Sequence, residues 1–86
     1  MKILKIFDNG GASIDRYTIV TDERVGIYYL GLGISENPEK LQGGFSQWEM
    51  FHPDYLNTGA PGDIEIQFSD LPEIAQKHVL QKMGRD

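Results

Sequence analysis

Residues 8–11, Asp-Asn-Gly-Gly, constrain the fold of this chain more than any other stretch. Asn and Gly tolerate the positive φ angles of a tight chain reversal, so this tetrapeptide predicts a turn. Residues 2–7 before it and residues 16–21 after it are rich in aliphatic, β-branched and aromatic side chains, which favour β-strands. The pattern therefore predicts two antiparallel strands joined by a tight connection.

The middle of the chain predicts one more strand and then an interruption. Residues 25–32 are apolar on both faces, which is typical of a central strand, and residues 22–24 (Asp-Glu-Arg) are expected to connect it to the strand before. Residues 33–44 contain Asn-Pro and Gly-Gly and predict a loop, which at this length is more often functional or mobile than accidental. Aromatic residues at close to helical spacing predict a short helical turn or two over residues 45–52, and a second loop is expected at residues 57–62.

The last third of the chain predicts a half-buried strand followed by a helix. Residues 63–68 alternate strictly, and the side chains expected to point inward are Ile64, Ile66 and Phe68. Asp70 is expected to cap the helix, Glu73 to complete a capping box, and Gly84 to end the helix. The apolar face of this helix is expected to comprise Leu71, Ile74, Ala75, His78, Val79 and Met83.

These elements predict an α+β fold, in which an antiparallel sheet of about four strands has one C-terminal helix packed on it. With 86 residues the chain has room for a single domain, residues 1–86, with one modest core. A composition of 40% hydrophobic and 24% charged residues is ordinary for a globular protein and too apolar for a disordered one.

Charge and cysteine content argue against several functional classes. Thirteen acidic and eight basic residues give a net charge of −5, and the basic residues are scattered. A nucleic-acid partner is therefore disfavoured, because phosphate binding needs clustered Lys and Arg. The absence of cysteine removes disulfides, thiolate metal ligands and thiol nucleophiles. No apolar run approaches the roughly 20 residues of a membrane span, and the Lys-interrupted N-terminus does not match a signal peptide, so no membrane partner and a cytoplasmic location are expected.

Charged side chains around the first turn form the first candidate site. Arg16 would donate two hydrogen bonds to a carboxylate or phosphate, with Asp8, Asn9 and Asp15 orienting it. The alternative is a structural turn, in which the Asp side chains accept hydrogen bonds from nearby backbone N–H groups and one Asp–Arg pair lies on the surface. The residues themselves leave both interpretations open.

The aromatic residues between positions 45 and 55 form the second candidate site. Trp48 and Tyr55 would anchor a flat ligand or a protein partner, since Trp and Tyr dominate the energetics of interfaces. The alternative is that these rings close the core of a small domain, which is the expected role of Phe45 and Phe51.

Metal, cofactor and catalytic sites are not expected. His52 and Asp54 would supply only two metal ligands, and His78 lies on the apolar face of the predicted helix, where a structural role is expected. Residues 31–33, Gly-Leu-Gly, lack the third glycine of a dinucleotide-binding turn. No nucleophile with an orienting partner can be assigned, so no catalytic residue is predicted.

The order of short motifs along the chain resembles a group of small uncharacterised proteins from bacteria, phages and plasmids. The matching positions are residues 8–11, 15–18, 37–38, 42–43, 47 and 71–73. The chain departs from the pattern at Phe7, where the group has Tyr, and at residues 39–40, Glu-Lys, where more aromatic or proline content is expected.

The resemblance implies no established activity. It does imply that the first turn and the loop from Asn37 to Gln47 belong to one functional surface, and it adds Tyr17 and Gln42 to the candidate site. It also implies an origin in a mobile element, with accessory roles such as countering host defence.

Three functions are expected, in this order. The first is a non-enzymatic binding protein with a protein partner, such as a phage or mobile-element inhibitor of a host defence protein; it should expose Trp48 or Tyr55 in an apolar patch. The second is a binder of a small ligand or nucleotide that uses Asn9, Arg16 and residues 35–48, and it should show an enclosed pocket with Arg16 pointing in. The third is a small hydrolase-like enzyme. The residues indicate no oligomeric state.

Overall fold

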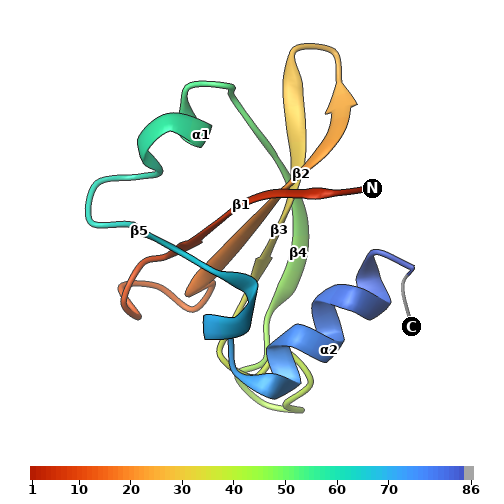
Figure 1. The fold of residues 1–86 in the computed structure, drawn as a ribbon. Coiled ribbons are helices and arrows are strands. Elements are labelled where there is room, and N and C mark those ends of the chain that lie inside the picture. Colours follow the sequence, from red (N-terminus) through yellow and green to blue (C-terminus); the bar gives the residue numbers. More distant parts are fainter. Residues whose placement is uncertain (85–86) are drawn as a thin grey trace.

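The computed structural model describes residues 1–84 and contains a five-stranded antiparallel sheet in the order β4-β3-β2-β1-β5 (Figure 1). The strands are β1 (Ile3–Asp8), β2 (Tyr17–Val25), β3 (Tyr28–Ile34), β4 (Ser46–Phe51) and β5 (Ile64–Ile66). The helices are α1 (Tyr55–Thr58) and α2 (Glu73–Lys82), and a single 3-10 turn, η1 (Phe68–Asp70), precedes α2. The predicted α+β fold with a C-terminal helix packed on an antiparallel sheet is confirmed.

The predicted turn at residues 8–11 begins the connection between β1 and β2, which spans residues 9–16 and is longer than the tight connection predicted. Asp8 pairs with Tyr17 across the two strands, and the backbone N–H of Asn9 donates to the carbonyl of Arg16 at 2.9 Å. Gly10 has a φ of 75°, a conformation that side chains with a Cβ rarely adopt. Local turn chemistry therefore determines this connection.

The next connection lies further along the chain than predicted. Residues 22–24 continue β2 instead of ending it, and Val25 pairs with Tyr28 around a two-residue turn. Gly26, at the first turn position, has a φ of 63°, which is the arrangement of a type II′ hairpin turn. The resulting hairpin arm, residues 22–29, projects beyond the rest of the sheet in Figure 1.

The predicted helical turn over residues 45–52 is wrong, because this segment forms strand β4. Trp48 pairs with Leu32 of β3, and Phe51 pairs with Tyr29. Pairing along the open edge of β3 satisfies backbone groups that a short isolated helix would leave to water, so tertiary contacts override the helical spacing.

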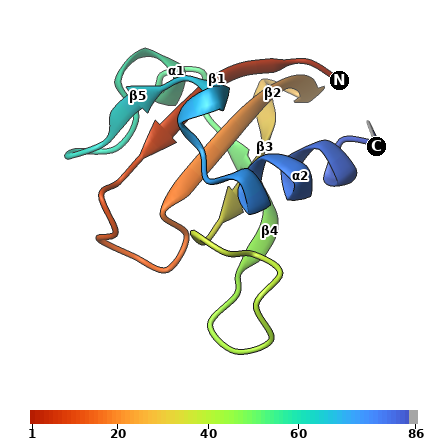
Figure 2. The same ribbon diagram turned by 60° about the horizontal axis from the view of Figure 1, so that its bottom comes forward.

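The main core lies between α2 and one face of the sheet, and Figure 2 shows α2 lying over β3 and β4. Its buried side chains are Ile6, Tyr17, Ile19, Leu32, Ile34, Leu71, Ala75 and Val79. His78, expected to be half-buried on the apolar face of the helix, is buried, and its ring bonds to the hydroxyl of Ser46 at 2.7 Å and to the carboxylate of Glu39. This histidine therefore ties α2 to β4 and to the β3–β4 loop.

Several details of the C-terminal prediction are wrong, including the capping box of Glu73, because α2 begins at that residue and has no side-chain cap hydrogen bond. Ile74 is 41% exposed and Ile64 is 67% exposed, so neither contributes to the core. The carboxylate of Asp70 accepts a hydrogen bond from the backbone of Gln67 at 2.9 Å, so it stabilises η1 and not the start of α2. The helix begins at Glu73, directly after a proline, and its buried residues are Ala75, His78 and Val79. Ile74 lies about 100° around the helix from Ala75, which places it at the margin of this buried face.

The opposite face of the sheet has a smaller apolar layer covered by α1. Phe7 and Val20 are buried there, and the Tyr55 ring meets the Phe7 ring edge-on at 5.2 Å. The two helices thus lie on opposite sides of one sheet (Figure 1). Within residues 1–84, no helix is long and apolar enough to cross a membrane.

Candidate functional site

Asp8 and Arg16 form a bidentate ion pair at the end of the β1–β2 connection. Nε of Arg16 donates to one carboxylate oxygen of Asp8 at 2.9 Å, and Nη2 donates to the other at 3.2 Å. Nη1 of the same guanidinium donates to the carboxylate of Glu36. The hydrogen bond from Arg16 holds the pKa of Asp8 below its ordinary value, and these two acids raise the pKa of Arg16 further. The guanidinium is therefore fixed in place by partners within the chain.

The side chains of the turn itself also bond locally. Asp8 accepts from the backbone N–H of Gly10 at 2.8 Å, and the Asn9 carbonyl oxygen accepts from Gly11 at 2.8 Å. The Asn9 amide donates to the hydroxyl of Ser13 at 2.9 Å and to the backbone carbonyl of Asp15 at 3.2 Å. These bonds match the interpretation of Asp8 and Asn9 as structural turn residues. The role of Asp8 and Asn9 in binding stays a prediction.

Asp15 and Arg16 are neighbours in sequence but lie on opposite faces of the sheet. The guanidinium of Arg16 lies 5.3 Å from the ring of Tyr17, which is a buried core residue on the α2 side. Asp15 lies beside Gly33 on the α1 side, where its carboxylate would be 3.6 Å from a Cβ built on that glycine. The Asp15 carboxylate accepts from the Ser13 hydroxyl, whereas the bonds of the Arg16 guanidinium go to Asp8 and Glu36, so Asp15 does not orient Arg16.

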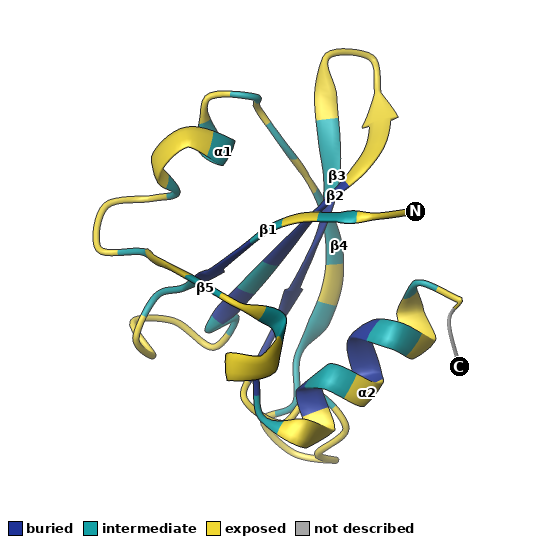
Figure 3. Cartoon of the chain, viewed as in Figure 1, coloured by how far each residue is buried: buried dark blue, intermediate teal, exposed yellow. Residues whose placement is uncertain are grey.

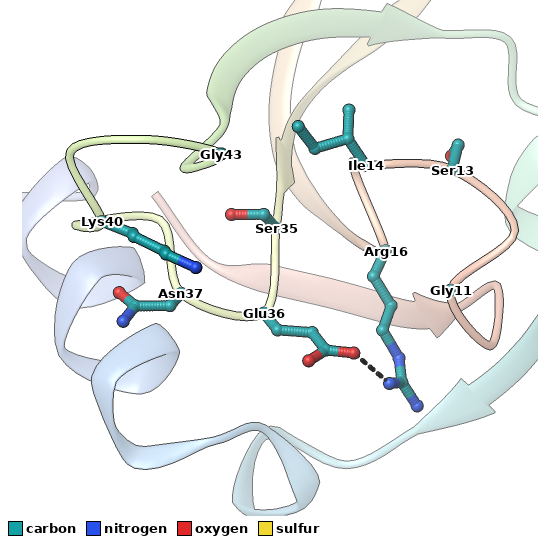
Figure 4. Close-up of a pocket in the computed structure, with 9 residues that line it drawn as sticks. All are labelled: Gly11, Ser13, Ile14, Arg16, Ser35, Glu36, Asn37, Lys40 and Gly43. Atoms are coloured by element: carbon teal, nitrogen blue, oxygen red, sulfur yellow. Dashed lines mark hydrogen bonds and ion pairs between the residues drawn. The ribbon is translucent and has the colours of Figure 1, made fainter.

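A pocket of about 300 Å³ lies between the β1–β2 connection and the β3–β4 loop (Figure 4). It is lined by Gly11, Ser13, Ile14, Arg16, Ser35, Glu36, Asn37, Lys40 and Gly43. The first turn and the predicted loop therefore do meet at one surface. The Lys40 side chain extends toward Ser35 and Glu36, and its ammonium group has no ion-pair or hydrogen-bond partner among residues 1–84.

Among the loop residues predicted for the site, only Asn37 lines this pocket. Its side-chain oxygen accepts from the backbone N–H of Glu39 at 3.2 Å, which shapes the loop. Gln42 is exposed further along the loop. Gln47 lies in β4 and pairs with Gly33, so its side chain is on the α1 side of the sheet.

The two aromatic residues predicted to form a contact patch are on opposite faces. Trp48 is half-buried and packs against the core beneath α2. Tyr55 is half-buried on the other side, where it stacks on Phe51 at 4.7 Å and donates to the carboxylate of Asp63 at 3.0 Å. Burial is the main reason that the pKa of Tyr55 rises to about 12. Because β4 is a strand, alternation separates these residues and they form no common aromatic patch.

Two carboxyl groups come together over Gly33 on the α1 side. A Cβ on this glycine would lie 2.7 Å from the carboxylate of Glu49, with that of Asp15 close by. Burial, reinforced by the charge of Asp15, raises the pKa of Glu49. Glu49 is not among the predicted site residues, and the glycines of β3 were the available signal, because Gly33 leaves the space that the Glu49 carboxylate occupies. Within residues 1–84 no group of three or more His, Cys, Asp or Glu side chains is placed to hold a metal ion.

The hairpin tip, defined here as Val25, Ile27 and Tyr28, groups three exposed apolar residues that were not among the predicted site residues. These side chains are 51%, 56% and 42% exposed, respectively, and Figure 3 shows the whole end of the arm as exposed. Gly26 was the available signal, because a glycine between two β-branched residues marks a turn within an apolar run.

Comparisons with protein-family models, with curated proteins and with solved structures find no match for this chain. The choice between the candidate surfaces therefore depends on their own geometry.

Proposed function

We propose that this protein is a non-enzymatic binding protein that contacts a protein partner through the hairpin tip. The observation that carries the proposal is the exposure of Val25, Ile27 and Tyr28 together at the end of a projecting arm. Single exposed apolar residues are ordinary on protein surfaces, whereas a group of them on a protruding element is typical of an interaction site.

The arm is stiffened by contacts that do not involve the exposed side chains. The guanidinium of Arg24 lies 4.4 Å from the ring of Tyr29 and donates to the carbonyl of Ile27 at 3.3 Å. A rigid contact element loses less conformational entropy on binding, so more of the contact energy appears as affinity. Tyr28 adds an aromatic side chain of the type that dominates interface energetics.

Charge near the arm supports a protein as the partner. Asp22 and Glu23 are exposed in the same arm, and the chain carries a net charge of −5. Both features disfavour phosphate-rich nucleic acids and anionic lipid surfaces, and they fit a protein surface with a basic rim around an apolar centre. The resemblance to phage and plasmid proteins extends the proposal to a host protein that this chain would inhibit.

A second candidate function is binding of a small anion in the pocket beside Lys40. The unpartnered ammonium group of Lys40 favours it. Arg16 argues against it, because its guanidinium is already bonded to Asp8 and Glu36. The pocket therefore supports this function less well than the arm supports protein binding.

Photo-crosslinking tests the proposed function. A benzophenone amino acid replacing Tyr28 should give one discrete protein adduct in cells that naturally produce this protein, whereas the same amino acid replacing Glu65 on β5 should give none. Ile27→Asp should abolish capture of that partner without changing the thermal midpoint. Ile64→Asp is the matched control, because Ile64 is an isoleucine of comparable exposure, 67% against 56% for Ile27, at the far edge of the sheet. Equal adducts from both positions, or no adduct from position 28, would overturn the proposal.

A further inference from the structure

Strand β4 forms an edge of the sheet whose outer backbone groups are unused. The N–H of Ser35 donates to the carbonyl of Phe45 at 3.0 Å, which identifies this pair as a hydrogen-bonded pair of the antiparallel ladder. Such pairs alternate along the ladder, so the backbone groups of Ser46, Trp48 and Met50 point away from β3. No other segment within residues 1–84 bonds to them. These outward groups are called the β4 edge below.

The β4 edge is the longer of the two edges of the sheet. β4 has six residues, whereas β5 at the opposite edge has three. Met50 is 58% exposed and Trp48 is half-buried, so the strand also keeps apolar surface beside its free backbone groups. An unprotected edge of this kind is a template for pairing with another strand.

We propose that the β4 edge pairs with the β4 edge of a second copy of this chain, antiparallel and centred on Trp48. In this register Ser46 faces Met50 of the second copy, and Trp48 faces its own counterpart. All three outward-pointing residues therefore meet outward-pointing residues, so each free N–H finds a free carbonyl. The pairing joins two five-stranded sheets into one continuous sheet.

The charges on β4 favour the pairing centred on Trp48 over pairings centred on the residues next to it. With the centre at Trp48, Gln47 lies opposite Glu49 of the second copy, and its amide can donate to that carboxylate. A centre at Glu49 would place two like charges directly opposite each other, which is destabilising. A centre at Gln47 would leave Met50 opposite the loop at Gly44. A slip of one residue would place the outward-pointing backbone groups of one copy opposite residues of the other copy whose backbone groups already bond to β3.

The hairpin tips stay accessible in this dimer. Each arm leaves the sheet at the Phe51 end of β4, because Phe51 pairs with Tyr29. In an antiparallel pair those ends lie at opposite sides of the joined sheet. The dimer therefore goes beyond the proposed function and would present two copies of the hairpin tip.

Sedimentation velocity of the full chain over the micromolar range tests the dimer. Wild type should associate to a dimer with rising concentration, and Met50→Lys should remain monomeric because it places a charge on the pairing edge. Ile64→Lys is the matched control on β5 and should dimerise like wild type. A wild type that stays monomeric, or a Met50→Lys variant that still dimerises, would overturn the inference.

A charge exchange tests the register and does not depend on one variant folding. Gln47→Glu places Glu opposite Glu49 of the second copy at two symmetric positions, and it should weaken dimerisation by about tenfold. Adding Glu49→Gln restores a Gln–Glu pair and should recover wild-type affinity. Failure of the double variant to recover, with an unfolding midpoint no lower than that of the wild type, would reject the Trp48-centred register. None of these changes touches Tyr28, so failure of the dimer and failure of partner binding are separable.

Discussion

Phe51 packs directly on the backbone of Gly31 in the neighbouring strand. A Cβ built on Gly31 would lie 2.5 Å from the ring of Phe51 and 3.2 Å from the carbonyl oxygen of Ile19. The glycine therefore lets the Phe51 ring lie close to the sheet, where Tyr55 stacks on it at 4.7 Å. The layer between the sheet and α1 depends on this close approach.

Gly31→Ala is expected to destabilise the protein by about 1–3 kcal/mol, because the added methyl group overpacks this layer. Gly33→Ala is the matched control and should cost less, since the atom it meets is the carboxylate at the end of the flexible Glu49 side chain. Urea unfolding of both variants measures the difference. Equal losses would show that Phe51 moves aside as easily as Glu49.

The helix α2 provides a second prediction on stability. Leu71→Ala should cost about 2–5 kcal/mol, because Leu71 is a buried core side chain just before the helix. Ile74→Ala should change stability by less than about 0.5 kcal/mol, since that side chain is 41% exposed and Ala favours a helix more than Ile does. Thermal unfolding distinguishes the two, and a large loss from Ile74→Ala would mean that α2 is rotated relative to this description.

The first turn, strand β4 and helix α2 show how far the sequence could predict the fold. The first turn follows from Asn9 and Gly10 alone, because the required backbone conformation is local. Strand β4 could not be predicted this way, since its spacing of aromatic residues fits a helix and only pairing with β3 makes it a strand. The exposure of Ile74 was missed because this residue lies at the margin of the apolar face, and only the packing of α2 on the sheet decides which side of that face is covered.

The candidate sites were harder to predict than the fold. Glu49 and Asp15 meet over Gly33 only because β3 lies between the strand and the turn that carry them. Nothing within a few residues of either carboxylate indicates this meeting. Gly26, by contrast, carried a local signal for the hairpin tip, but the apolar residues around it matched a continuous strand equally well.

The Asp8–Arg16 pair predicts a loss of stability in acid. Because the hydrogen bond from Arg16 lowers the pKa of Asp8 below 3.8, this pair stabilises the fold above that pH and is lost as the pH falls through the lowered value. Asp8→Asn should therefore lower the urea midpoint at pH 7 and have little effect at pH values below the folded pKa. A pH-independent effect would show that the ionised form of Asp8 is not what stabilises the fold.

The carboxyl group of Glu49 should change the stability of the fold with pH in the opposite direction. Burial raises the pKa of Glu49 above 4.5, so its contribution favours folding below that pH and is lost as the pH rises through the raised value. Glu49→Gln should therefore stabilise the protein at pH 7, and the gain should vanish in acid. Carboxyl NMR titration should show a raised midpoint for Glu49 that Asp15→Asn lowers. An ordinary midpoint for Glu49 in the wild type would contradict this prediction.

Trp48 reports on the β4 edge through its fluorescence, because it is the one tryptophan in the chain. It is half-buried in the single copy and lies at the centre of the proposed dimer, so pairing should shield its exposed part. Quenching by acrylamide should therefore decrease as the wild-type concentration rises through the range in which sedimentation detects dimers. Met50→Lys should show the same quenching at every concentration, while Ile64→Lys should follow the wild type. A wild-type dimer whose Trp48 quenching does not change would place the contact on another surface of the molecule.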